Sequence, residues 1–390
     1  MNQDIKPETG TTEQPPVARK VLVLGRSDAV LQTVLDELTA FGIEARGTAS
    51  PESAADHFDA RDFDLIALGR GLLGEAGDAL KARLRQRHPG VRLLDTYAPF
   101  AAHQIIAALD REQPPAPDLD AYCARIGYHG PLTPTLETLQ GLHARHPDAI
   151  AFEAIDVLLD RGVDISPKAV EDKLIHAGRG GYCFEHNGLF KRVLEALGFH
   201  VEGLTARVRW MAKPGTAPQP HSHMALKVWI DHRPWLVDVG FGGNVLTTPL
   251  RMDTTEPQPT QHETFRLIPY GPGLLLQAQI DGDWRPVYEL SGEPLLNGDY
   301  EVANWYTSTY PQSPFRSHLM VARTTPDARY KLLNGRLTTQ FPDGTSHRQE
   351  LDAESLEQVL RDTFGLPVTA EWRGMIERAI KRTAEADPGE

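Results

Sequence analysis

The chain has few cysteines, no long apolar run and no cluster of basic residues, and each absence excludes a class of protein. Cys123 and Cys183 are the only cysteines among 390 residues, which excludes a disulfide framework and fits a reducing compartment. No apolar stretch reaches the roughly 18 residues that span a bilayer. Residues 1–17 lack the charged-then-apolar pattern of a secretion signal. We therefore predict a cytoplasmic protein with no membrane partner.

The charge balance argues against binding to nucleic acid. Asp and Glu number 53 against 40 Lys and Arg, so the formal net charge is -13 at pH 7. A polyanion is held mainly by clustered Lys and Arg, and no basic run is present. An acidic chain of this kind needs a local positive pocket if it is to hold an anionic cofactor.

The length indicates more than one hydrophobic core. Single cores stop growing near roughly 250 to 300 residues, so 390 residues predict two or three domains. We predict a flexible tail at residues 1–18, a small α/β domain at 19–110 and a linker at 111–118, where "REQPPAPD" concentrates proline and charge. Beyond the linker, residues 119–200 are expected to be mostly helical, 201–300 strand-rich and 301–388 mixed.

The first domain alternates short apolar runs with helical patterns. Strands are predicted at 21–24, 43–47, 65–68 and 91–94, and helices at 30–38, 53–58, 80–84 and 105–109. This alternation predicts a small parallel sheet with helices on both faces.

Its segments "KVLVLGRSDAVLQTVLDELTAFG" and "FDLIALGRG" resemble a response-regulator receiver domain, a flavodoxin-like α/β fold. The resemblance implies that Gly25, Arg26 and Ser27 replace an acidic pair, and that Gly69 replaces the phosphorylated aspartate. Because glycine cannot be phosphorylated, we expect a docking or dimerisation module that provides a homodimer or protein contact. "LGRSDAV" also lacks the G-x-G-x-x-G of dinucleotide-binding folds.

One cysteine lies at a predicted helix start. In "GRGGYCFEHNGLFKRVLEALGF", a glycine-rich break precedes apolar residues at helical spacing, and Gly198 provides a stop. Cys183 falls where this helix begins. The unpaired amides and positive dipole end at such a position favour an anion, and therefore the nucleophilic thiolate. The alternative is a buried cysteine that only packs.

A predicted hairpin carries a histidine and an aspartate on one face. "HMALKVWIDHRPWLVDVGFGG" contains strand-like residues 223–230 and 235–239 around the turn-rich residues 231–234. The even loop length places alternate apolar residues on one face and His223 and Asp238 on the other. The simplest register sets Asp238 opposite Lys227, so contact with His223 requires a shifted or bulged pairing.

Together these three residues predict nucleophilic catalysis. Asp238 would hold the tautomer of His223 and stabilise its imidazolium, while His223 deprotonates Cys183. Taken singly, Asp238 also fits a buried carboxylate paired with an arginine, and His223 an edge-strand histidine. Their occurrence together with a cysteine at a helix start favours the catalytic interpretation.

Several segments resemble successive signatures of the arylamine N-acetyltransferases, in that family's order: "RGGYCFEHNGLF", "HSHMALKV", "WLVDVGFGG" and "NWYTSTYPQSPF". Residues 122–159 resemble its N-terminal helical region. The resemblance implies a multidomain α/β protein whose helical bundle, β-barrel and α/β lid surround a cysteine-protease-like Cys-His-Asp core. It also implies ping-pong transfer of an acetyl group from acetyl-CoA, the cosubstrate, through a Cys183 thioester to an aromatic amine or hydrazine.

The resemblance assigns roles to individual residues. It makes Cys183 the nucleophile, His223 the base and Asp238 its orienting partner. It implies that the acceptor pocket is lined by three aromatic side chains, Phe184, Phe241 and Phe315. An aromatic wall suits a flat arylamine, although core packing would explain each ring equally well.

Four further positions carry supporting roles in the resemblance. Gly242 matches a place where the backbone approaches coenzyme A. Arg125 and Glu153 match a structural ion pair, and Asn187 supports the site.

Other chemistries stay open at this point. A Cys-His-Asp hydrolase or transglutaminase-like enzyme would share the triad, some family members are amide synthases, and a non-enzymatic sensor would retain the fold alone. His221 and His223 form a His-x-His pair, but no third ligand has matching spacing and H-E-x-x-H is absent, so no metal is expected.

Overall fold

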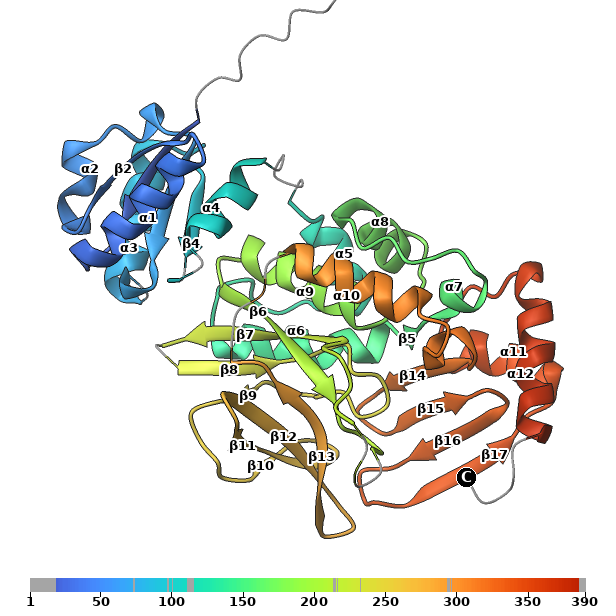
Figure 1. The fold of residues 1–390 in the computed structure, drawn as a ribbon. Helices are drawn as coiled ribbons and strands as arrows, with labels where there is room; N and C mark the ends of the chain where they lie inside the picture. Colours follow the sequence, from blue (N-terminus) through green and yellow to red (C-terminus); the bar gives the residue numbers. More distant parts are fainter. Residues whose placement is uncertain are drawn as a thin grey trace, which may run out of the picture. The chain divides into compact units, whose positions relative to one another are not determined.

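The computed structural model describes residues 19–385, except 73, 97, 100, 111–115, 213, 214, 216, 232, 293, 294 and 296. The chain divides into two compact units between residues 113 and 114 (Figure 1). The predicted tail, residues 111–115 of the predicted linker and residues 386–388 of the predicted lid lie outside the described residues.

The first unit is built on a parallel sheet of order β2-β1-β3-β4. Its strands are β1 (Lys20–Leu24), β2 (Glu44–Thr48), β3 (Leu65–Gly69) and β4 (Leu93–Thr96), and its helices α1 (Asp28–Ala40), α2 (Ala54–His57), α3 (Glu75–Arg87) and α4 (Ala101–Asp110). The predicted alternation of strands and helices is confirmed. The strand order equals the first four strands of flavodoxin-like sheets.

Alternation along β1 explains why helices cover both faces of this sheet. Val21 and Val23 pack in one core with α1 and α4, whereas Leu22 and Leu24 pack in a second core with α2 and α3. Successive strand side chains point to opposite faces, so an unbroken apolar run is buried on both sides.

The second unit carries the remaining helices and strands. Its α-helices are α5 (Leu119–Ile126), α6 (Leu136–Ala149), α7 (Ile155–Leu158), α8 (Pro167–Glu171), α9 (Cys183–Ala196), α10 (Asn297–Thr309), α11 (Ala353–Asp362) and α12 (Arg373–Glu385). Its strands are β5 (Phe152–Glu153), β6 (His200–Val208), β7 (His223–Ile230), β8 (Arg233–Val237), β9 (Leu250–Arg251), β10 (Gln258–Pro259), β11 (Thr264–Tyr270), β12 (Gly273–Ile280), β13 (Asp283–Leu290), β14 (Met320–Thr324), β15 (Arg329–Leu333), β16 (Arg336–Gln340) and β17 (Ser346–Glu350).

Helix α9 lies at the centre of the helical core. Its buried side chains share one apolar cluster with α5, α6 and the alternate residues of β7: Met224, Leu226, Val228 and Ile230. Tyr300 of α10 joins the same cluster, and its hydroxyl donates to Leu204 O at 3.1 Å. Helix α10 therefore packs with the helical core and runs across residue 300, where the predicted barrel and lid were divided.

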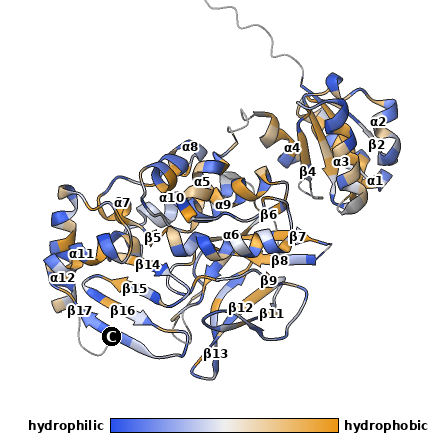
Figure 2. Cartoon of the chain, turned by 180° about the vertical axis from the view of Figure 1, so that it is seen from behind, coloured by the Kyte–Doolittle hydropathy of each residue, from blue (hydrophilic) through white to orange (hydrophobic). Residues whose placement is uncertain are grey.

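Two antiparallel sheets complete this unit. The first has eight strands in the order β10-β11-β12-β13-β6-β7-β8-β9 and encloses its own apolar core. The second has five strands in the order β17-β16-β15-β14-β5, and helices α11 and α12 pack against it in one apolar core. Its edge strand β17 is exposed along its length and hydrophilic (Figure 2).

Strand β5 departs from the predicted helical segment 119–200. It pairs with β14, Val321 opposite Glu153, so the helical region contributes a strand to the sheet of the predicted lid. Among the described residues, none of the helices is long and apolar enough to cross a membrane.

Candidate active site

Cys183 is the first residue of α9, as the glycine break and apolar spacing predict. Glu185, two residues further on, accepts the Tyr182 backbone N–H at 2.9 Å and so closes the first turn. The Cys183 side chain is 5% exposed, and its Sγ lies 3.7 Å from Ser222 O. The thiol therefore stands at a capped helix start beside the beginning of β7.

His223 and Asp238 are in direct contact. His223 Nε2 lies 2.7 Å from Asp238 Oδ2, and both side chains are almost fully buried. This contact uses one ring nitrogen and leaves Nδ1 for a second partner. The structure thus brings together the pair that strand parity placed on one face.

The expected register of this hairpin is wrong by two residues. Lys227 pairs with Leu236 rather than with Asp238. Strand β8 begins at Arg233, so the turn is two residues shorter than predicted, and its His232 lies outside the described residues. The tighter turn slides β8 along β7 and carries Asp238 towards His223.

The pKa values of the pair favour charge separation. Burial opposes protonation of His223, but the Asp238 carboxylate outweighs it. Together with a hydrogen bond and charge interaction with Cys183, this carboxylate raises the pKa of His223 to about 10. Burial likewise opposes the Asp238 anion, yet His223, Asn187 and the Gly240 amide lower its pKa. An imidazolium is therefore stabilised between a carboxylate and the sulfur.

Asn187 connects α9 to the chain that carries Asp238. Its Nδ2 donates to Asp238 Oδ1 at 3.0 Å and to Met224 O at 2.8 Å, while its Oδ1 accepts the Val239 N–H at 3.1 Å. This buried amide occupies the supporting position that the family resemblance implies.

Gly240 allows the chain to pass close to Cys183. Its N–H donates to Asp238 Oδ1 at 3.0 Å. A Cβ at this position would lie 2.9 Å from Cys183 Cα and 3.0 Å from His186 Cβ. Only glycine fits here without displacing backbone.

A row of buried histidines lies next to Asp238. His146 Nε2 and His186 Nδ1 are 2.9 Å apart, and Tyr122 OH lies 2.9 Å from His146 Nδ1. His143 Nε2 accepts the Asp238 backbone N–H at 3.3 Å. Burial lowers the pKa of His143 and of His186 to about 4. These rings are therefore neutral at physiological pH.

The predicted ion pair between Arg125 and Glu153 is wrong. Arg125 donates to backbone carbonyls, including Ala149 O at 2.8 Å. Glu153 is paired with Arg179, whose Nη2 lies 2.7 Å from Glu153 Oε1. The fold places Arg179, in the loop before α9, nearer to this buried carboxylate, and Arg125 closes the ends of neighbouring helical segments instead.

A buried ionic network continues from this pair towards α9. Lys173 lies 2.7 Å from both Glu185 and Asp156. Burial works against the charge on Lys173, but these carboxylates and Glu153 raise its pKa. The network therefore anchors Glu185, which caps the helix that begins at Cys183.

The three predicted pocket aromatics occupy two places. Phe184 and Phe315 both pack on Tyr182, at centroid distances of 5.5 and 5.8 Å. Phe241 packs on the His223 ring at 5.1 Å. Within the described part of the chain, no ring contact joins Phe241 to the other two.

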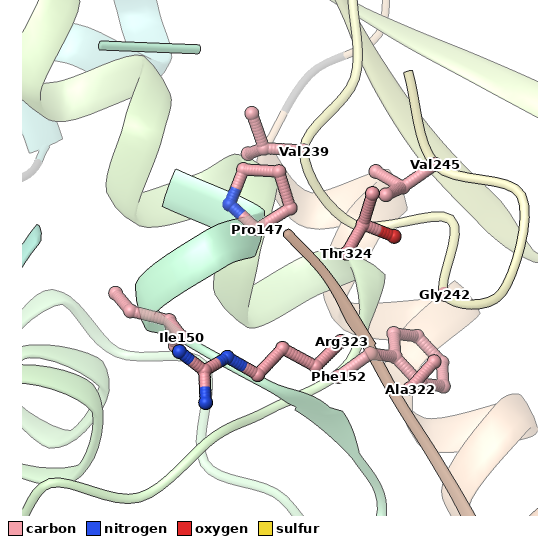
Figure 3. Close-up of a pocket in the computed structure, with 9 residues that line it drawn as sticks. All are labelled: Pro147, Ile150, Phe152, Val239, Gly242, Val245, Ala322, Arg323 and Thr324. Atoms are coloured by element: carbon pink, nitrogen blue, oxygen red, sulfur yellow. The ribbon is translucent and has the colours of Figure 1, made fainter. Parts of the chain in front are cut away.

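Gly242 lies in the turn after Asp238, with φ of +80°, and a Cβ there would stand 3.3 Å from the Phe152 ring. It lines a small hollow with Phe152, Val239 and β14 residues (Figure 3). Its left-handed conformation favours glycine, and an added Cβ would press on the neighbouring ring.

Cys123 and His221 lie apart from this arrangement. Cys123 of α5 is partly buried against the helical core, and both cysteines are free. His221 precedes β7 and is partly exposed. In the described ranges, no three His, Cys, Asp or Glu side chains are grouped so that they could hold a metal.

Sequence reasoning missed several groups of this site. Tyr182, Gly240 and Lys173 gave no separate prediction because their contacts are made across the fold. The spacing of His143 and His146, three residues apart on a helix, was an available signal that both rings share one face.

Comparison with known proteins relates the second unit to one enzyme family. The N-acetyltransferase family profile matches residues 135–373. The arylamine N-acetyltransferase of Mycobacterium tuberculosis is 41% identical over 276 residues, which cover 70% of this chain and 98% of the relative. The arylamine N-acetyltransferase / N-hydroxyarylamine O-acetyltransferase of Salmonella typhimurium is 38% identical over 264 residues, covering 67% of this chain and 93% of the relative.

A solved structure gives the same result. The Mycobacterium marinum arylamine N-acetyltransferase in complex with CoA superposes with a TM-score of 0.65 at 40% sequence identity, and the match covers 68% of this chain and 99% of that one.

Proposed function

This chain belongs to the arylamine N-acetyltransferase family, whose members transfer an acetyl group from acetyl-CoA to an aromatic amine, and we propose that Cys183 carries the acetyl group between the two substrates. His223 is the acid and base of the reaction, and Asp238 orients it. The observation that carries this proposal is the 2.7 Å contact between His223 and Asp238 beside a cysteine at the start of α9.

In the first half-reaction the Cys183 thiolate attacks the acetyl carbonyl carbon of acetyl-CoA. A new carbon–sulfur bond forms, the bond to the CoA sulfur breaks, and His223 gives its proton to the departing thiolate. The raised pKa of His223 supports this step, because the imidazolium that gives up the proton is then already present before the substrate binds.

In the second half-reaction His223, now neutral, accepts a proton from the attacking amine. The nitrogen–carbon bond forms, the thioester bond breaks, and the sulfur returns to its anionic state beside the imidazolium. Because CoA leaves before the amine reacts, the kinetics are ping-pong. We extend the acceptors to hydrazines, which present a similar nucleophilic nitrogen.

We assign the acceptor site to Phe184, Phe241 and Phe315. Phe315 and Phe241 are partly exposed, so flat rings could stack on them beside the sulfur and the imidazole. Phe184 is 2% exposed and supports the site from the core through Tyr182. The turn at Gly242 is assigned to coenzyme A.

Intact-mass spectrometry tests the proposed nucleophile. Incubation with acetyl-CoA should add one acetyl group to the protein, and an arylamine should then remove it. Cys183→Ala should remain unmodified, while Cys123→Ala should behave as the wild type. Acetylation of the Cys183→Ala protein that an arylamine discharges would refute the assignment.

The receiver-like first unit is proposed to act in docking or dimerisation. The family profile leaves this unit unmatched. Its sheet order and the absence of a phosphorylatable side chain at Gly69 support a binding role over phosphosignalling. We keep a cytoplasmic location as part of this proposal, because two free cysteines suit a reducing compartment.

A further inference from the structure

A lysine lies directly against the glycine turn that follows Asp238. Lys331 extends from β15 along Gly243, where an added Cβ would stand 3.1 Å from Lys331 Cδ. Its Nζ donates to Asn244 Oδ1 at 2.7 Å and to Gln340 Oε1 at 2.9 Å. Two neutral amide oxygens thus hold the ammonium group, and its third N–H can serve another acceptor.

The positive charge of Lys331 is not matched by a carboxylate. Glu263 is already engaged by the buried Arg329, whose Nε and Nη2 lie 3.0 and 2.6 Å from Glu263 Oε2. No carboxylate of the described residues lies within ion-pair distance of Lys331 Nζ. Burial and Arg329 lower the pKa of Lys331 to about 8, while Glu263 acts in the opposite direction. An anion at this position would relieve that repulsion.

Asn244 supplies a second donor at the same place. It is 4% exposed, and because an ammonium group can only donate, its Oδ1 must face Lys331. Its Nδ2 is buried and has no hydrogen-bond partner among the residues that the structure describes. Such a group normally finds an acceptor, so a ligand oxygen would satisfy it.

We propose that Lys331 and Asn244 bind a phosphate group of acetyl-CoA beside the turn at Gly242 and Gly243. This inference rests on the proposed function, which assigns coenzyme A to that turn. Phosphate oxygens accept charge-assisted hydrogen bonds from ammonium groups and ordinary ones from amides. A single phosphate can therefore accept from both Lys331 Nζ and Asn244 Nδ2. In a chain of net charge -13, this cluster is the local positive pocket that an anionic cosubstrate requires.

The competing explanation is a purely structural clamp, in which Lys331 only ties β15 to the glycine turn. A clamp would affect every ligand of the turn alike, whereas a phosphate site affects only ligands that carry phosphate. Pantetheine is the discriminating probe, since it shares the thiol arm of coenzyme A and has no phosphate.

Calorimetric titration of the full-length protein with CoA, dephospho-CoA and pantetheine tests the proposal. Lys331→Met keeps the methylenes against Gly243 and removes the charge. We expect it to weaken CoA binding about tenfold and to leave pantetheine binding unchanged. If the variant also loses affinity for dephospho-CoA to the same extent, Lys331 contacts the pyrophosphate. If the variant binds dephospho-CoA as tightly as the wild type does, Lys331 contacts the 3′-phosphate. Unchanged CoA affinity, or an equal loss for pantetheine, overturns the proposal.

Two further variants keep the test decisive. Asn244→Asp places a carboxylate on the ammonium group of Lys331 and should weaken CoA binding similarly, even if Lys331→Met does not fold. Lys381→Met, on the exposed surface of α12, should bind CoA as the wild type does. Acylation of wild-type Cys183 by p-nitrophenyl acetate, which has no phosphate, tests the proposed nucleophile separately from this inference.

Discussion

Asn187 donates a hydrogen bond to Asp238 across 3.0 Å, and this contact joins the helix that begins at Cys183 to the carboxylate that contacts His223. The same side chain accepts the Val239 N–H, so the amide contacts both the Asp238 carboxylate and the backbone of the next residue. One asparagine thus sets the distance between two elements that carry different parts of the proposed triad.

Replacing Asn187 by alanine should lower kcat/KM for arylamine acetylation by roughly 10- to 100-fold, because a hydrogen bond to a charged group is lost. The acid limb of the rate profile should also move to higher pH, since Asn187 helps to lower the Asp238 pKa. Asn334→Ala is the matched control, because this buried asparagine accepts the Leu319 N–H beside the five-stranded sheet and should change stability without moving the profile. An unshifted profile in Asn187→Ala would contradict the role.

Much of this site follows from local sequence patterns. The glycine break and the apolar spacing place Cys183 at a helix start, and strand parity places His223 and Asp238 on one face. Both are short-range rules that depend on backbone periodicity. The hairpin register escaped prediction because it depends on where the turn closes, and β8 begins at Arg233 instead of Trp235.

Long-range pairing is where sequence reasoning fails. Arg125 and Arg179 are equivalent as residue types, and nothing local shows which one reaches Glu153. Packing decides, since Glu153 belongs to a strand that pairs with β14 more than 160 residues later in the chain. The same limit applies to Lys331 and Asn244, whose contact spans 87 residues.

Two glycines close to Cys183 should respond oppositely to alanine. Gly240→Ala would force a Cβ to 2.9 Å from Cys183 Cα, so we expect a loss of about 1–3 kcal/mol in the free energy of unfolding and reduced acylation of Cys183. Gly188 lies within α9 with open space around its Cα, and Gly188→Ala should gain about 0.5–1 kcal/mol. Chemical unfolding followed by fluorescence measures both. A neutral Gly240→Ala would show that the close approach is not required.

Removal of Arg179 should lower the free energy of unfolding far more than removal of a lysine from an exposed ion pair. Arg179→Met leaves the fully buried Glu153 without its cation and should cost about 3–5 kcal/mol. Adding Glu153→Gln should recover part of this loss, because the uncompensated charge is then gone. Lys168→Met, which breaks an exposed pair with Asp172, should change the free energy of unfolding by less than about 1 kcal/mol. Equal losses in Arg179→Met and Lys168→Met would contradict the buried network.

The buried histidines predict a loss of stability in mild acid. The folded-state pKa values of His143 and His186 are lowered to about 4 from 6.5, so the unfolded chain binds more protons between these limits. Their contribution to the free energy of unfolding should be fully present above about pH 6.5 and should fall as the pH approaches 4. Each group contributes roughly 3 kcal/mol. His143→Gln retains an acceptor for the Asp238 N–H and should make this pH dependence shallower. The exposed His347→Gln is the control, and an identical slope in both variants would refute the assignment.

The final prediction concerns the second unit alone, whose six tryptophans, from Trp210 onwards, make its unfolding visible by fluorescence without any signal from the first unit. The M. tuberculosis relative is matched over 98% of its length by 70% of this chain, so a protein beginning at residue 114 has the extent of a complete enzyme. It should unfold cooperatively and acetylate arylamines with a kcat/KM within about twofold of the full chain, because the proposed triad and its supporting contacts all lie beyond that point. The control is the full-length protein carrying Gly69→Ala, which alters the first unit without removing it. A truncated protein that folds but loses acetylation would show that the first unit contributes to catalysis, and the docking role proposed for it would then be insufficient.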